Sequence, residues 1–231
     1  MIHLGFGLYR HMLDTDHYRF ARQCGATHAV IHLVDYYGNC SSDQNQPVGD
    51  KYGWGRARRD DAVWELPSLL KIKYEMAAEG LTLYAIENFN PYDWYDVLLD
   101  GPRKREQTER LKQIIRNVGE AGIPVFGYNF SLAGVGGRIE GPFARGGALS
   151  VGMDGVTEEP VPQGMVWNMQ YADELGPGTI SPCTQDELWE RLSWILGEML
   201  PVAEAAGVRM ALHPDDPPVP VLRGPPRLVY Q

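Results

Sequence analysis

Short apolar runs alternate with longer amphipathic segments along this chain, and glycine marks the boundaries. Gly25, Gly80, Gly122 and Gly207 each follow a segment with helical spacing and precede an apolar run, and glycine readily adopts the left-handed conformation that ends helices. The expected strands cover residues 2–8, 28–34, 81–87, 123–130 and 208–213, and the expected helices cover about 14–24, 65–79, 103–121 and 185–206. This repeated order predicts a parallel sheet with right-handed helical crossovers.

Long connections follow the strands, whereas short ones follow the helices. Residues 35–61 are rich in Gly, Asn, Ser, Asp and aromatic side chains, and residues 131–184 are rich in Gly and Pro. Such long loops at strand ends are typical of a (β/α) barrel whose site lies at the carboxyl ends of the strands. We therefore predict an α/β fold of the TIM-type (β/α) barrel kind. A doubly wound open sheet is the alternative, but no GxGxxG motif follows the first run.

The predicted barrel is partial. Five strands and four helices account for the pattern, so residues 1–231 are expected to form a single barrel domain that is incomplete at its C-terminal end. A complete barrel of this kind needs eight strands and typically ~250 residues.

The most concentrated chemistry follows the last apolar run. His213 is succeeded by Asp215 and Asp216 on a turn that contains three prolines, which stiffen the backbone. A neutral imidazole suits Mn²⁺ or Fe²⁺, and a nearby carboxylate can orient the ring. From the residues alone, His213 is either a ligand or a structural histidine. The two aspartates either form a solvated turn or exchange protons with a substrate.

Three more polar residues are candidates for binding a substrate. Glu87 ends an otherwise apolar run. It is either a carboxylate of the functional site or an acid that braces a loop. Asn129 offers a donor and an acceptor to a polyol, or to loop backbone. Arg138, in a glycine-rich segment, suits bidentate binding of a carboxylate, although a solvated surface arginine is the alternative.

Other polar and aromatic residues give weaker signals. His11, His17, His28 and His32 show no metal-ligand spacing with one another, and we interpret them as structural. The Tyr-Gly-Trp-Gly-Arg segment at residues 52–56 suggests a lid that stacks on a sugar, or else a hydrophobic plug or a subunit contact. The aromatic segment from Tyr92 to Tyr95 suggests an exposed hydrophobic patch, from which we expect a homodimer.

Composition narrows the classes of function. With 44% hydrophobic and 22% charged residues, the chain is typical of globular proteins. Its formal net charge of -9 argues against nucleic acid or an anionic membrane as the main partner, while a small anionic substrate stays compatible. Three cysteines are too few for a disulfide framework, and no apolar run approaches the ~20 residues of a membrane span. With no leader-like N-terminus, a cytoplasmic location is expected.

Several of these segments resemble the mannonate dehydratase family. The resemblance is most specific over residues 201–218 and 222–229, and residues 80–87 and 122–130 agree with the family in the same order. It implies a barrel like that of xylose isomerase, use of Mn²⁺ or Fe²⁺, and conversion of D-mannonate to 2-keto-3-deoxy-D-gluconate plus water in glucuronate catabolism. It also implies that His213 is a metal ligand and that Asp215 and Asp216 take part in catalysis.

In that family the remaining ligands, a cysteine, a second histidine and an aspartate, come from later strands. We therefore expect the 231-residue chain on its own to bind the metal weakly. Three functional hypotheses follow: a metal-dependent sugar-acid dehydratase, a related sugar isomerase or epimerase, and a non-catalytic barrel remnant that acts as a binding or assembly partner.

Overall fold

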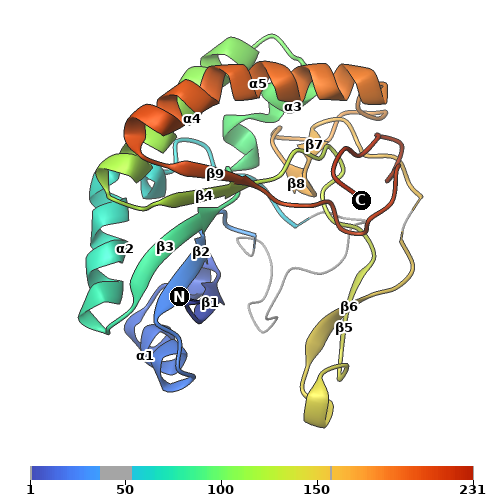
Figure 1. Ribbon diagram of the computed structural model, residues 1–231. Helices are drawn as coiled ribbons and strands as arrows, with labels where there is room; N and C mark the ends of the chain where they lie inside the picture. Colours follow the sequence, from blue (N-terminus) through green and yellow to red (C-terminus); the bar gives the residue numbers. More distant parts are fainter. Residues whose placement is uncertain (1, 37–53, 157, 231) are drawn as a thin grey trace.

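A curved parallel sheet forms the centre of the molecule (Figure 1). The computed structural model describes residues 2–36, 54–156 and 158–230. The sheet has the order β1-β2-β3-β4-β9, and its strands are β1 (Gly5–Leu8), β2 (His28–His32), β3 (Thr82–Glu87), β4 (Val125–Tyr128) and β9 (Arg209–Leu212). All four pairings are parallel, which confirms the predicted fold class. Among the described residues the barrel is not closed, and β1 and β9 are the edges of the sheet.

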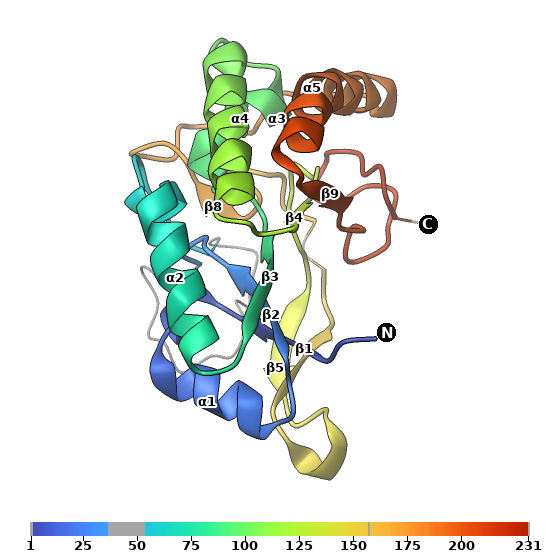
Figure 2. The same ribbon diagram turned by 60° about the vertical axis from the view of Figure 1, so that its left-hand side comes forward.

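The four predicted helices form and cover the outer face of the sheet (Figure 2). They are α1 (Thr15–Gln23), α2 (Leu66–Ala78), α4 (Lys104–Glu120) and α5 (Gln185–Ala206). Additional short helices are η1 (Arg10–Met12), η2 (Ala62–Trp64), η3 (Pro91–Asp93), α3 (Tyr95–Leu99) and η4 (Arg145–Gly147). Thr184 and Glu187 form a capping box at the start of α5, and Gly207 ends this helix at φ 68°. None of the helices in the described ranges is long and apolar enough to cross a lipid bilayer.

The core lies between the helices and the outer face of the sheet. Ile31, Ile86 and Phe126 are in register on adjacent strands, and all three are fully buried. Because side chains alternate along a strand, the neighbouring residues point to the opposite, inner face. There Val30, Ala85 and Val125 are in register, as are His32 and Glu87 at the strand ends. The alternation therefore directs His32 and Glu87 to the inside of the barrel.

The segment 131–184 is more ordered than the sequence predicts. It contains two antiparallel hairpins, β5 (Arg138–Gly141) with β6 (Ser150–Met153) and β7 (Met165–Val166) with β8 (Met169–Gln170). Strands of two to four residues are too short to leave a recognisable alternation among many glycines and prolines. In the other predicted loop, residues 37–53 lie outside the described part of the chain.

The aromatic segment from Tyr92 to Tyr95 does not form the exposed patch that we predicted. Trp94 is only 2% exposed, with its ring 5.5 Å from that of Phe89. The ring of Tyr95 stacks on Tyr171 at 4.0 Å. Because these rings pack against other aromatic rings of the same chain, the segment gives no support for a dimer interface. The homodimer stays a prediction.

Asp93 is a buried carboxyl group whose contribution to stability can be tested. This carboxyl is 8% exposed, with Arg110 Nε at 3.9 Å and Asn90 Nδ2 at 3.2 Å. Burial raises the pKa of Asp93 to about 6, although Arg110 acts in the opposite direction. Because the folded state holds this proton more tightly than the unfolded state, the stability gained from protonation is lost as the pH rises through 6.

We therefore expect Asp93→Asn to raise the free energy of unfolding at pH 7.5 by about 1–3 kcal/mol. The dependence of stability on pH between 4 and 7 should also become flatter. Urea denaturation at pH 4.5 and 7.5 measures both effects, with Asp154→Asn, at an exposed position, as the control. A less stable variant at pH 7.5 would show that the ion pair with Arg110 outweighs the cost of burial.

Candidate functional site

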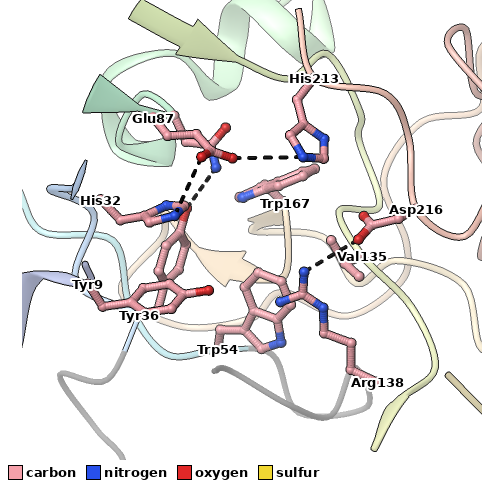
Figure 3. A pocket seen from close by; sticks show the side chains of 11 residues that line it. Tyr9, His32, Tyr36, Trp54, Glu87, Val135, Arg138, Trp167, His213 and Asp216 are labelled. Atoms are coloured by element: carbon pink, nitrogen blue, oxygen red, sulfur yellow. Dashed lines mark hydrogen bonds and ion pairs between the residues drawn. The ribbon is translucent and has the colours of Figure 1, made fainter. Parts of the chain in front are cut away.

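A pocket opens where the carboxyl ends of the parallel strands meet (Figure 3). Tyr9 follows β1, His32 ends β2, Glu87 ends β3 and His213 follows β9. The backbone N–H of His213 donates to the carbonyl of Tyr128 at 2.7 Å, which extends the pairing of β4 with β9. The residues that line the pocket are Tyr9, His32, Tyr36, Trp54, Glu87, Asn88, Val135, Arg138, Trp167, His213 and Asp216.

Two imidazoles converge on the carboxylate of Glu87. Oε2 of Glu87 lies 3.6 Å from His32 Nε2, and Oε1 lies 3.9 Å from His213 Nε2. Gly127 is opposite Glu87 on β4, and a Cβ there would lie only 3.3 Å from Glu87 Cγ. The missing side chain of Gly127 therefore leaves room for the carboxylate to face both histidines.

His32 is the site residue that the sequence interpretation missed. Its ring stacks on Tyr9 at 4.5 Å, and its buried Nδ1 has no hydrogen-bond partner in the described structure. Burial lowers the pKa of His32, while Glu87 acts in the opposite direction, so burial favours the neutral ring. Spacing to other histidines gave no signal, but His32 ends an apolar strand just as Glu87 does. The position at the strand end was the signal that could have identified it.

Arg138 is held inside the pocket and is not a solvated surface residue. Its Nη2 lies 3.4 Å from Oδ2 of Asp216, and the guanidinium lies 5.3 Å from the centre of the Trp54 ring. Burial raises the pKa of Tyr9, and Arg138, which is hydrogen-bonded to the phenol, opposes this shift. Arg138 thus supplies positive charge directly to the pocket, where the sequence predicted a carboxylate clamp.

Asp215 and Asp216, which we predicted to take part in catalysis together, point in different directions. Asp215 is 8% exposed and faces Arg227, whose Nη2 lies 3.2 Å from Oδ1 of Asp215. Its other oxygen accepts the backbone N–H groups of Leu228 and Val229 at 3.3 and 3.0 Å. Asp215 therefore fixes the C-terminal segment, and only Asp216 lines the pocket.

Asn129 lies behind the pocket wall, and not in it as predicted. Its Nδ2 donates to Asn88 Oδ1 at 2.8 Å, and Asn88 Nδ2 donates to the Tyr36 hydroxyl at 3.1 Å. Asn129 is only 2% exposed. This geometry makes it a positioning residue for Asn88, which does line the pocket.

The described residues do not form a metal site on their own. No group of three or more His, Cys, Asp or Glu side chains in the described ranges could hold a metal ion. His213, whose side chain is 48% exposed, is available as a single nitrogen donor, with Glu87 as the nearest carboxylate. These residues do not by themselves complete a coordination sphere, so the chemistry below is derived without a step through a metal.

The predicted aromatic lid is partly visible. Trp54 lines the pocket at 4% exposure, and its backbone N–H donates to the carbonyl of Asn168 at 2.5 Å. Tyr52 and Gly53 of the same prediction lie outside the described residues. Aromatic walls combined with a guanidinium, carboxylates and imidazoles suit a small anion that carries several hydroxyl groups.

Comparisons with known proteins agree with this chemistry. The D-mannonate dehydratase (UxuA) family matches residues 53–136 and 179–231. Mannonate dehydratases from Streptococcus equi subsp. zooepidemicus and Geobacillus thermodenitrificans are both 32% identical to this chain, over 178 and 185 residues. Each alignment covers 72% of this chain but only 48% and 49% of the relative, so the chain spans about half the length of these curated relatives.

A solved structure shares the fold. The crystal structure of mannonate dehydratase from Streptococcus suis serotype 2 aligns with a TM-score of 0.61 at 24% identity. The alignment covers 99% of this chain and 56% of that one. The five strands and their helices therefore correspond to a portion of a larger barrel.

Proposed function

Because the chain belongs to the D-mannonate dehydratase family, we propose that it contributes the N-terminal part of a lyase site that removes water from a sugar acid. D-mannonate is the proposed substrate and 2-keto-3-deoxy-D-gluconate the proposed product, in glucuronate catabolism. The observation that carries the proposal is the convergence of Arg138, Glu87, His32 and His213 on one pocket.

The pocket offers a role for each charged group. The guanidinium of Arg138 can exchange its contact with Asp216 for the carboxylate of the substrate. Two groups can then exchange protons with the substrate: the neutral His32, whose conjugate acid Glu87 stabilises, and the carboxylate of Asp216. Loss of the C2 proton leaves an electron pair that forms the C2=C3 bond. The C3–O bond breaks as this double bond forms, so that the C3 hydroxyl, once protonated, leaves as water, and the enol then rearranges to the ketone.

The family resemblance further supports Mn²⁺ or Fe²⁺ as cofactor. When bound, such an ion would polarise the oxygens of the substrate. Among the described residues we propose His213 as one of its donors. The family resemblance implies that the remaining ligands come from later strands.

Incubation of a full-length protein that contains this chain with D-mannonate and Mn²⁺, followed by assay for a 2-keto-3-deoxy acid, tests the proposal. Product formation supports the dehydratase. Interconversion of related sugars without a keto-deoxy product would identify an isomerase or epimerase instead. Binding of D-mannonate without turnover would support the non-catalytic alternative.

Arg138→Met is expected to weaken the binding of D-mannonate by about 10–100-fold, because a hydrogen-bonded charge pair contributes ~1.5–3 kcal/mol. The affinity of Arg138→Lys for D-mannonate should lie between those of the wild type and Arg138→Met, since lysine keeps the charge but not the planar arrangement of donors. Isothermal calorimetry measures both affinities. Arg145→Met, at an exposed position in η4, is the matched control. Equal affinity of Arg138→Met and wild type would exclude the clamp.

Two further expectations stay predictions, a cytoplasmic location and a homodimer. Light scattering at micromolar concentration tests the second. A monomer mass would contradict it.

A further inference from the structure

Six described non-glycine residues have a positive φ, and two of them, Asn88 and Trp167, line the pocket. Asn88, Trp167, Asn168 and Arg223 are non-glycine residues with φ of 68°, 51°, 56° and 54°. In the left-handed region the Cβ crowds the following carbonyl, so bulky residues such as tryptophan rarely adopt it. A strained conformation that persists near a pocket points to a function for the residue concerned.

Trp167 and Asn168 form the two-residue turn between β7 and β8, and this turn is held from several sides. Asn168 is fully buried, with Nδ2 donating to the carbonyl of Val135 at 2.5 Å and Oδ1 accepting from Arg223 at 3.3 Å. Gly134 packs beneath the turn at φ 74°, and a Cβ there would lie 2.9 Å from the carbonyl carbon of Trp167. These contacts fix the strained turn in one position.

The consequence of the turn is the placement of the Trp167 indole in the pocket. The ring is 6% exposed and lies edge-on to Trp54, with the centroids 6.3 Å apart. In Figure 3 it lies in the centre of the pocket, among the polar groups of Glu87, His213 and Arg138. A rigid nonpolar surface is thereby set inside a ring of hydrogen-bonding groups.

We propose that Trp167 determines which sugar acid the pocket accepts, by packing its indole against a C–H face of the substrate. This inference rests on the proposed function. With the carboxylate on Arg138, we expect the carbon chain to lie across the indole, with the hydroxyls pointing away from it toward Glu87 and His213. A stereoisomer with a hydroxyl directed at the ring would bury that hydroxyl without a partner, which is unfavourable.

Ligand-observed NMR tests this contact, with D-mannonate and its C2 epimer D-gluconate as probes. Saturation of the indole resonances should transfer to the C–H protons of D-mannonate in the wild type. In the Trp167→Asn variant, we expect D-mannonate to bind at least tenfold more weakly and the preference between the two epimers to be lost. Asparagine is chosen because it tolerates the left-handed region. Trp189→Asn, at a 44% exposed position on α5, should leave both unchanged.

The outcomes separate the inference from the proposed function. Suppose that the wild type binds D-mannonate and that a folded Trp167→Asn variant binds it with the same affinity and the same preference between the epimers. This result overturns the role of Trp167 and leaves the dehydratase proposal standing. No binding of either acid to the wild type overturns the proposed function, and this inference with it. If Trp167→Asn does not fold, Trp167→Phe decides: retained preference supports packing on an aromatic ring, and lost preference in a folded variant excludes it.

Discussion

Asp215→Ala is expected to lower the free energy of unfolding by about 3–5 kcal/mol, because it leaves a buried guanidinium without its counter-ion. The side chain of Arg227 is only 1% exposed, and burial already lowers its pKa while Asp215 acts in the opposite direction. The backbone N–H groups of Leu228 and Val229 would lose their acceptor as well. Urea denaturation, followed by circular dichroism, measures the loss.

Two further variants separate the contribution of the Asp215–Arg227 ion pair from other effects. Asp216→Ala, whose side chain is 31% exposed, should cost less than about 1 kcal/mol. Replacing Asp215 by Leu and Arg227 by Met together should recover much of the loss, since the pair is then removed without leaving a buried charge. Equal stability of Asp215→Ala and Asp216→Ala would contradict the assigned structural role. A folded Asp215→Asn variant that no longer binds D-mannonate would instead support a role for Asp215 in the functional site.

In a full-length protein that contains this chain, His213→Ala is expected to produce the largest functional effect, a loss of at least about 100-fold in mannonate turnover together with bound metal. The adjacent carboxylates cannot replace the imidazole, because Asp215 is engaged by Arg227 and Asp216 faces Arg138. Metal content by mass spectrometry and product formation from D-mannonate measure the two effects. Asp216→Asn should keep the metal and slow turnover.

The control for this prediction is His17→Ala on α1, where the imidazole contacts Asp14 and not the pocket. Unchanged metal content and rate in His213→Ala would show that His213 is not a ligand. For the wild-type chain we expect weak Mn²⁺ binding, since His213 and Glu87 alone do not close a coordination sphere. Stoichiometric Mn²⁺ at submicromolar free metal, measured by calorimetry, would contradict this.

The order of elements follows from the sequence because it depends on local patterns. Helical spacing, capping residues and terminal glycines predicted α5 at its observed bounds, Gln185–Ala206, and placed the five strands of the parallel sheet and the other three long helices within a few residues. The location of the pocket also follows, since parallel strands bring their carboxyl ends to one side of the sheet. Glu87 and His213 were identified for that reason, Asp216 from the turn that follows His213, and Arg138 from a glycine-rich loop, and all four line the pocket.

What the pattern leaves open is the direction of each side chain and its distant partners. Asp215 and Asp216 are adjacent and chemically identical, yet one faces Arg227 and the other Arg138, residues 12 and 78 positions away along the chain. His32 gained its role only because β2 pairs with β3 and brings the ring to Glu87. Trp167 was hidden in a Gly- and Pro-rich segment, because the turn that holds it depends on contacts from Gly134, Val135 and Arg223. Tertiary packing decides these positions, since the free energy that fixes them comes from groups that are remote in sequence.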